Sequence, residues 1–486
     1  MQQNNTLLPE VKAFLKKRES IPPKERIPLP HIDTLPQKIL DIAEELISIS
    51  GTWNPVEIYT ADPDSIIHEQ ANLFEAFLAT KPYTPTLTYS HTQNTDLAEE
   101  HDRLSQLLAE LEKYTPSGSL AVFAKKACLY KIRDDLSSCH LAENMNQRNE
   151  LAVKKILSWK YPGTDTVLMK IAQQYYEELT THGSFGRDTN ESFISMRDYA
   201  KLQSLVLSPE QQMKGFAFGL KQYGILRTKE EEPGYNLIID DRATALDVRD
   251  KTPLGPSLFI PTKRATPMTA AKFLPLLAHE VEGHARQSMI GQSLFLFGGG
   301  ALKIDDEQLY EGYAIRMEED CRHELFGIEK RIPRVYYPFA VRMAEQGSSF
   351  YEIFTDQVER RLRITYKIPL SKPLPPIHSF ARTAQDKAMH QAWRVTYRVM
   401  RGHSDMSNNA KFAMAKDLGY LRGRLIDRQL ESLGYGYVNE SSVIPVTMLP
   451  LYAQFAFSTN DIPKQLQFKN VAKQYWLEVL QKQLHI

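Results

Sequence analysis

Residues 277–284 read Leu277-Ala278-His279-Glu280-Val281-Glu282-Gly283-His284. Apolar residues in and around this stretch, from Phe273 to Ala285, recur at spacings of three and four, which is typical of one face of a helix. A buried helix rarely carries polar groups without partners, because each unpaired group costs free energy. Two histidines and a carboxylate on one helix are the components of a zinc peptidase site, namely two ligands and a general base.

The two histidines lie five positions apart, whereas the common H-E-x-x-H pattern places them four apart. A regular α-helix advances about 100° per residue, so His284 would point roughly 140° away from His279. Both imidazoles can face one metal ion only if the helix is locally widened, as in a π-turn. Gly283 weakens the helix at this point. We therefore predict a π-bulge between His279 and His284; the alternative is that both are ordinary histidines of a helix.

A third ligand is expected from a later helix, as in other zinc hydrolases with two histidines. Residues 305–314 read Asp305-Asp306-Glu307-Gln308-Leu309-Tyr310-Glu311-Gly312-Tyr313-Ala314, and the acids at the start favour a helix N-terminus. Glu311 is the predicted ligand, and Gly312 would allow close approach to the metal helix. Three other acids fit a solvated face or a supporting contact better: Glu307, Glu318 and Glu319.

These motifs resemble the microtubule-associated tyrosine carboxypeptidases and their bacterial relatives, of which this chain would be a divergent bacterial-type member. The resemblance rests on His279 to Gln287, on Tyr310 to Ala314, and on a block that ends in Tyr420-Leu421-Arg422-Gly423. It departs from the family in two places. Glu282 stands where a small residue is more usual, and Tyr310 replaces the Glu or Gln that opens the second block.

The resemblance implies that His279, His284 and Glu311 bind one zinc ion per chain and that Glu280 is the catalytic base. It implies a zinc-dependent carboxypeptidase that acts on the C-terminal tail of a peptide or protein and releases an aromatic residue. Two alternatives stay open at this stage. The chain could be a zinc endo- or aminopeptidase, or a non-catalytic helical protein that binds a metal ion.

A carboxypeptidase needs a cation for the terminal carboxylate of its substrate and a donor for the oxyanion that forms during hydrolysis. The candidates for these substrate-binding roles are Lys263, Arg264, Arg286, Tyr420, Arg422 and, as an oxyanion donor, His403. Lys263 and Arg264 can equally form a solvated turn. Arg286 can equally support Glu311 or Glu282.

The fold class predicted is α+β and predominantly helical, with a zincin-like catalytic core. Three short β-rich runs precede the metal helix: Asn236–Asp240, Ala245–Arg249 and Ser257–Pro261. We predict that they form a small antiparallel sheet beside that helix, whose edge can pair with an extended peptide. The domain boundaries predicted are an extended arm over 1–37, a helical N-terminal lobe over 38–230, the metallopeptidase core over 231–434 and a helical extension packed on the core over 435–486.

Composition places the chain among globular proteins. It has 486 residues, of which 42% are hydrophobic and 24% charged, and its formal net charge is zero. Zero net charge gives no support for a nucleic-acid or membrane partner. Three cysteines are expected to be free thiols, the N-terminus has no signal-peptide pattern, and no apolar run approaches the roughly 20 residues of a transmembrane helix. We therefore expect a cytoplasmic protein.

Overall fold

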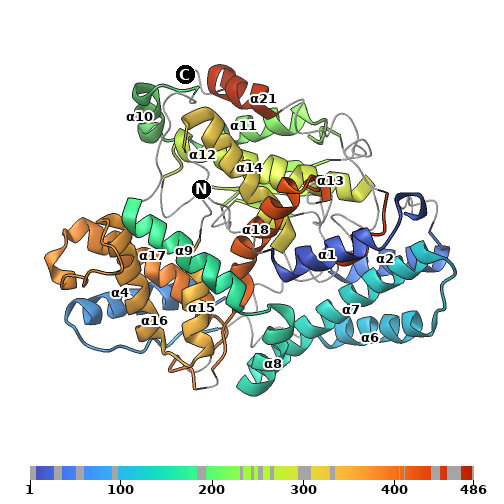
Figure 1. The fold of residues 1–486 in the computed structure, drawn as a ribbon, viewed down its shortest axis with the longest axis horizontal. Coiled ribbons are helices and arrows are strands. Elements are labelled where there is room, and N and C mark those ends of the chain that lie inside the picture. Colours follow the sequence, from blue (N-terminus) through green and yellow to red (C-terminus); the bar gives the residue numbers. More distant parts are fainter. Residues whose placement is uncertain are drawn as a thin grey trace.

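Helices dominate the chain in the computed structural model, as predicted (Figure 1). The structure describes residues 7–26, 35–50, 60–89, 97–182, 193–229, 234–241, 246–249, 256–262, 267–293, 308–328, 334–403, 406–409, 411–438, 449–456 and 472–483. The longer helices within these residues form three groups. Short 3₁₀ turns lie between them: η1 (Pro23–Glu25), η4 (Ile377–Ser379) and η5 (Ala415–Asp417).

The first group, at the lower right of Figure 1, consists of α2 (Gln37–Ser50), α6 (Ala98–Lys113), α7 (Ser119–Asn146) and α8 (Glu150–Lys160). The long helix α7 packs against the other three. Leu104, Leu107 and Leu111 of α6 are buried at spacings of three and four, so this helix contributes one apolar face to the group.

The second group, at the lower left of Figure 1, consists of α4 (Pro63–Leu78), α9 (Thr166–His182), α15 (Tyr337–Glu345), α16 (Phe350–Thr365) and α17 (Arg382–Met400). Phe74 and Phe77 of α4 contact Phe354 of α16, with ring centroids 5.9 and 5.1 Å apart. The residues predicted as one N-terminal lobe, 38–230, therefore supply helices to these two groups and also to the third group.

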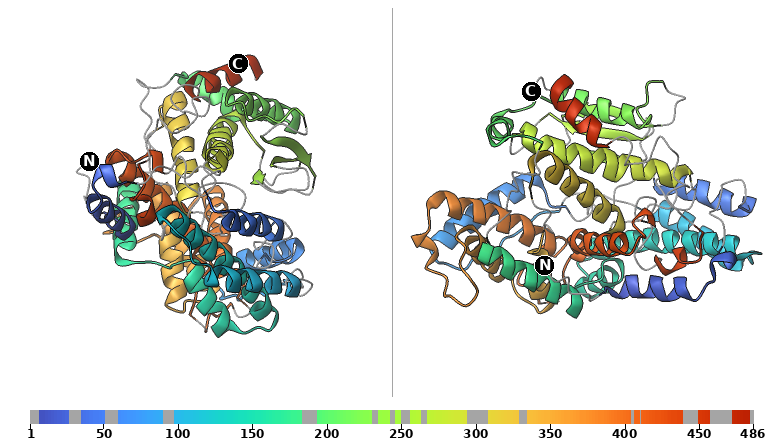
Figure 2. Two further views of the ribbon diagram at one scale, coloured as in Figure 1. Left: turned by 90° about the vertical axis from the view of Figure 1, so that its right-hand side faces the viewer. Right: turned by 45° about the horizontal axis from the view of Figure 1, so that its top comes forward.

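The third group includes and surrounds the predicted metal helix. It consists of α10 (Met196–Ser204), α11 (Pro209–Gln222), α12 (Ala270–Leu277), η3 (Ala278–Ala285), α13 (Arg286–Ser293), α14 (Gln308–Phe326), α18 (Leu418–Ser432), α21 (Ala472–Glu478) and η10 (Val479–Gln483). The short helix α20 (Leu449–Tyr452) packs on α1 (Pro9–Glu19) instead. In the left view of Figure 2, the gold α14 lies between the yellow-green η3 and the orange-red α18. The C-terminal helix α21 packs on α11 and α14.

Two helices of different groups begin with the same local signal. Ser208 accepts a hydrogen bond from the backbone N–H of Gln211, and the Gln211 side chain accepts one from the backbone N–H of Ser208. Ser349 and Glu352 make the same reciprocal pair at the start of α16. Each capping box satisfies backbone donors that the first turn of a helix leaves without partners, which fixes where α11 and α16 start.

The prediction of an extended arm over residues 1–37 is wrong for Pro9–Glu19, which form helix α1. The prolines that argue against a helix lie after α1, and Pro9 occupies its first turn, where a missing N–H costs nothing. Val11 and Phe14 are buried, and α1 packs against α18 and α20. The N-terminal segment is therefore part of the core structure near the third group.

The predicted strands form, but the prediction that all are antiparallel is wrong. The sheet has the order β1-β3-β2, with β1 (Asn236–Asp240), β2 (Asp247–Arg249) and β3 (Ser257–Pro261). β1 and β3 are parallel, and only β2 and β3 are antiparallel. Short apolar runs predict strands but carry no information on direction, and β3 takes the central position between its two predecessors. β2 packs against η3, so the sheet does lie beside the metal helix.

The three cysteines, Cys128, Cys139 and Cys321, are buried free thiols, as predicted. Among the described helices, none has both the length and the apolar character that crossing a membrane requires.

Candidate metal centre

The predicted π-bulge is confirmed, because residues Ala278–Ala285 form the π-helical segment η3 between α12 and α13. A π-helix joins residues five positions apart by hydrogen bonds, so it brings His279 and His284 to the same side. Pro275 lies inside α12, where it cannot donate a backbone hydrogen bond. This proline is a second sequence signal, besides Gly283, for a change of helical register at this point.

Three ligand atoms converge at η3 and α14. Oε2 of Glu311 lies 3.5 Å from Nε2 of His279 and 3.9 Å from Nε2 of His284. The rings of the two histidines are almost perpendicular, with centroids 4.7 Å apart. Three ligands at tetrahedral zinc distances lie roughly 3.4 Å from one another, so these separations match a metal site without large rearrangement.

The surroundings of these atoms also fit a metal ion. His279, His284 and Glu311 are all buried, and their ligand atoms lie within 4.8 Å of one another. Oε2 of Glu311 is fully buried and makes no well-formed hydrogen bond to any described residue. An unsatisfied buried carboxylate oxygen is costly unless a cation completes it. This group of residues can therefore hold a metal ion.

Each of the two histidine rings is also contacted by another side chain of α14. Oε2 of Glu318 lies 3.4 Å from Nδ1 of His279, on the ring nitrogen that does not face Glu311. Carboxylates in this position fix the tautomer and the orientation of metal-binding histidines. Tyr310 stacks on His284, with ring centroids 4.0 Å apart. Of the three alternative acids, Glu318 is thus a supporting residue, and Glu307 lies outside the described residues.

Glycine allows the metal helix to approach α14, but through Gly283 rather than Gly312. A Cβ atom added to Gly283 would overlap the Cα and Cβ atoms of Ala314. A Cβ atom added to Gly312 would instead overlap the backbone carbonyl of Gly423 on α18. Gly312 does allow a close approach, but the prediction named the wrong neighbour. Gly312 lets α14 pack closely on α18, and Gly283 lets η3 pack closely on α14.

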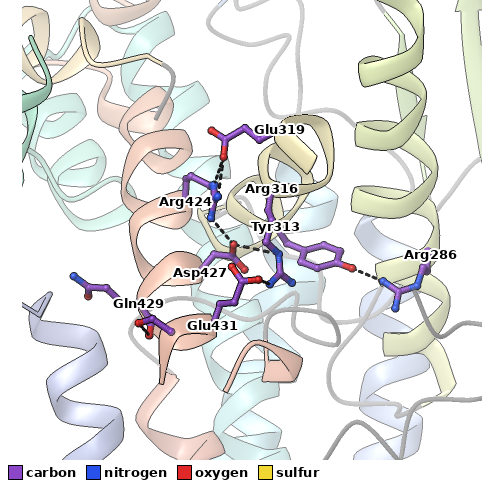
Figure 3. Close-up of polar contacts among 9 residues, drawn as sticks. Arg286, Tyr313, Arg316, Glu319, Arg424, Asp427, Gln429 and Glu431 are labelled. Carbon is purple, nitrogen blue, oxygen red and sulfur yellow. Dashed lines mark hydrogen bonds and ion pairs between the residues drawn. The ribbon is translucent and has the colours of Figure 1, made fainter. Parts of the chain in front are cut away.

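Ion pairs join α14 to α18, as Figure 3 shows. Arg424 pairs with Glu319 at 2.7 Å and with Asp427 at 2.9 Å. Nε of Arg316 lies 3.4 Å from Asp427, and its Nη1 lies 3.3 Å from Glu431. All of these side chains except Glu431 are buried. The ion pairs therefore fix the position of α14 relative to α18, which Gly312 allows to approach closely.

Arg286 and Arg422, both predicted to bind substrate, instead have structural partners. Nη1 of Arg286 donates to the Tyr313 hydroxyl, which links the residue after η3 to α14 (Figure 3). Nη1 of Arg422 donates to Glu10 at 2.9 Å, and its Nη2 pairs with Asp165. Both arginines are buried. Through Glu10, Arg422 links α18 to α1. Because it already has two carboxylate partners, it does not suit the role of a substrate anchor.

The other predicted substrate-binding residues have three different placements. Lys263 and Arg264 lie outside the described residues. His403 is buried with its ring stacked on Phe412, at a centroid distance of 3.7 Å. Tyr420 lies under the guanidinium of Arg334, so its role as an oxyanion donor stays a prediction.

Arg334 is a residue of this region that the sequence does not single out. Its Cζ atom lies 3.4 Å from the centroid of the Tyr420 ring. Burial raises the pKa of Glu311, but His279, His284 and Arg334 together bring it well below its usual value, so Arg334 is near the ligand. Arg334 stands between helices after a proline, a context that contains no metal-site pattern.

Glu282, which is unusual for the family that the motifs resemble, is held by the C-terminal helix. Its Oε1 accepts hydrogen bonds from the Tyr475 hydroxyl and, at 2.6 Å, from Nε1 of Trp476. All three side chains are fully buried. Helix α21 thus contacts the π-helical segment at Glu282, between Glu280 and His284.

We expect Glu282→Gln to reduce the loss of thermal stability that accompanies a rise in pH from about 4.5 to about 8. Burial raises the pKa of Glu282 to about 8, against a usual value of 4.5. Folding therefore takes up a proton, and the stability from the protonated form is lost as the pH rises from the usual value through 8. Gln keeps an acceptor for Tyr475 and Trp476 but does not ionise.

Melting temperatures of both proteins between pH 5 and 9 measure this effect, which we expect to reach a few degrees at about 1.4 kcal/mol per unit of pKa shift. Glu25→Gln, at an exposed carboxylate, is the matched control and should follow the wild type. Equal slopes for Glu282→Gln and wild type would show that Glu282 is ionised in the folded protein at neutral pH.

Comparison with known proteins adds no family, since no family model matches the chain and no curated protein matches it.

Proposed function

We propose that this protein is a zinc-dependent carboxypeptidase that hydrolyses the last peptide bond of a peptide or protein tail and releases an aromatic residue. The observation that carries the proposal is the buried convergence of His279, His284 and Glu311, with Glu280 directly after the first ligand. The preference for a C-terminal, aromatic residue is supported by the resemblance of the two motif blocks.

Zinc is the metal we propose, because two imidazole nitrogens and one carboxylate oxygen are a common catalytic zinc set that leaves a coordination position open. The metal helix beside a small sheet supports a zincin-like arrangement of the core. A zinc ion in this site would supply Lewis acidity, which makes a water molecule more acidic and polarises the scissile carbonyl.

Glu280 is the proposed general base. It is buried and adjacent to a ligand, so its carboxylate can take a proton from the attacking water. The water oxygen then bonds to the carbonyl carbon, the C–N bond breaks, and Glu280 delivers the proton to the leaving amine. Glu318 and Tyr310 hold the rings of His279 and His284 in place during these steps.

Zinc binding to the metal-free protein is expected to release a proton from His279. Burial alone would lower the pKa of His279, but Glu311 and Glu318 raise it to about 10, so the ring is protonated at pH 7. A metal ion must displace that proton, and zinc affinity should rise about tenfold per pH unit between pH 6 and 8.

Titration calorimetry in two buffers of different ionisation enthalpy measures the released protons. Glu318→Gln is the comparison variant, because it removes one of the carboxylates that raise the pKa of His279 and should release fewer protons at pH 8. Binding heats that do not depend on the buffer would contradict a protonated His279.

The proposed function is tested by incubating the zinc-loaded protein with a library of peptides and identifying the products by mass spectrometry, with and without a chelator. We expect loss of one C-terminal residue that the chelator abolishes. Internal cleavage or shortening from the N-terminus would assign the alternative zinc endo- or aminopeptidase. Stoichiometric zinc without any cleavage would indicate a non-catalytic metal-binding protein.

A further inference from the structure

Arg334 has an incomplete set of partners. Its Nη1 is buried and makes no hydrogen bond to any described residue. The guanidinium lies against the face of Tyr420, which attracts a cation but accepts no in-plane hydrogen bond. A buried donor of a charged group that lacks an acceptor is costly, so an anion from outside the chain would be favoured here.

Two carboxylates that interact electrostatically with Arg334 have other roles or partners. Glu311, which Arg334 influences, is a metal ligand in the proposed site. Asp417, which Arg334 also influences, pairs with Arg398 at 2.8 Å and lies 3.5 Å from Arg401. Arg398 and Arg401 therefore already contact the one carboxylate of Asp417.

The backbone of Arg334 supports a functional reason for its position. Its φ angle is 68°, in the left-handed region that a residue with a side chain rarely adopts. Such conformations cost about 1–3 kcal/mol and occur at ligand-binding positions, where the surrounding structure maintains them. Arg334 is thus held in a strained backbone conformation with its guanidinium against the Tyr420 ring.

We propose that Arg334, stacked on Tyr420, binds the C-terminal carboxylate of the peptide substrate and thereby places the last peptide bond at the metal centre. This inference rests on the proposed function. A planar guanidinium suits a carboxylate because two parallel N–H groups can donate to its two oxygens. Arg334 thus takes the role for which the sequence offered Lys263, Arg264, Arg286 and Arg422, and it is a specificity-determining residue rather than a catalytic one.

The test compares one fluorescent hexapeptide library, randomised at its last residue, as free acids and as C-terminal amides. Binding is measured by anisotropy to the zinc-loaded Glu280→Gln protein, so that this readout does not depend on hydrolysis. We expect the acids to bind about 100-fold more tightly than the amides, since hydrogen bonds to charged groups contribute this much. Addition of Arg334→Gln should reduce the ratio below about threefold.

Two further variants make the result specific. Arg334→Lys keeps the charge but not the paired donors, so its acid-to-amide ratio should be intermediate. Arg360 stacks on Phe339 at 3.8 Å in a similar way, but its Nε already donates to Asp356. Arg360→Gln is therefore the matched control and should keep the full ratio. Zinc content and melting temperature of each variant report whether the metal site and fold are intact.

The outcomes distinguish failure of the proposed role of Arg334 from failure of the proposed carboxypeptidase activity. Equal binding of acids and amides, or an unchanged ratio in a folded Arg334→Gln protein with normal zinc content, would overturn the role of Arg334. If the acids bind through Arg334 but the wild-type protein cleaves neither library, the anchor stands and the carboxypeptidase proposal fails.

Discussion

Replacing Glu280 by Gln is expected to lower kcat for peptide hydrolysis about 1,000-fold while zinc stoichiometry stays that of the wild type. Gln has nearly the same shape as Glu but cannot accept a proton from water. The three ligand residues are unchanged, and Glu280 lies beside them on η3 without belonging to the ligand set. The expected result is therefore a folded, zinc-containing protein that binds substrate and does not turn it over.

The measurement combines zinc analysis of the purified variant with product formation from the peptide library. Glu282→Gln is the matched control, because it makes the same change two positions along the same segment, at a carboxylate held by Tyr475 and Trp476. It should retain hydrolysis at neutral pH. Near-normal activity in the Glu280→Gln protein would exclude Glu280 as the base and would leave the metal centre without an assigned proton acceptor.

The candidate metal site is the part of this protein that the sequence predicts best. The spacing of His279 and His284 can serve one metal ion only if the helix widens, so the π-segment follows from the motif together with helix geometry. Glu311 follows from the need for a third ligand on a later helix. These are local patterns, and each of them limits the possible geometry strongly.

Substrate-contacting residues could not be predicted in the same way. Arg422 has a family-like context, yet its partners Glu10 and Asp165 are distant in sequence and come together only in the folded chain. Arg334 has no motif at all, and its contact with Tyr420 of α18 forms only in the folded chain. A single arginine in a sequence does not reveal whether carboxylates elsewhere in the chain already occupy its donors.

The fold errors have a similar physical origin. The N-terminal prolines hide α1, because a composition rich in proline describes an interval and not the position of each proline within it. The strands were predictable from their apolar runs, but the parallel pairing of β1 with β3 is a long-range choice. Gly312 was correctly seen as a site of close approach, whereas its neighbour Gly423 could not be deduced without the fold.

Substitution of Gly283 by Ala is expected to weaken zinc binding by about 100-fold, although Gly283 binds no metal. The added Cβ would lie well inside van der Waals contact with Ala314, where two carbons require roughly 3.5–4.0 Å. The overlapping atoms all belong to Ala314 of α14, and Arg316 and Arg424 hold α14 on α18, so η3 and α14 must separate. Glu311 would then move relative to His279 and His284 by more than the roughly 0.2 Å that metal coordination tolerates.

Competition with a zinc chelator measures the affinity, and Gly219→Ala provides the comparison. Gly219 on α11 also faces η3, but a Cβ there would lie 3.3 Å from Tyr475 and 3.5 Å from Val281, both of them side-chain contacts that can adjust. That variant should keep zinc affinity within a fewfold of the wild type. If Gly283→Ala binds zinc as tightly as Gly219→Ala, the close packing of η3 on α14 does not position the ligands, and Glu311 must be held by the α14–α18 ion pairs alone.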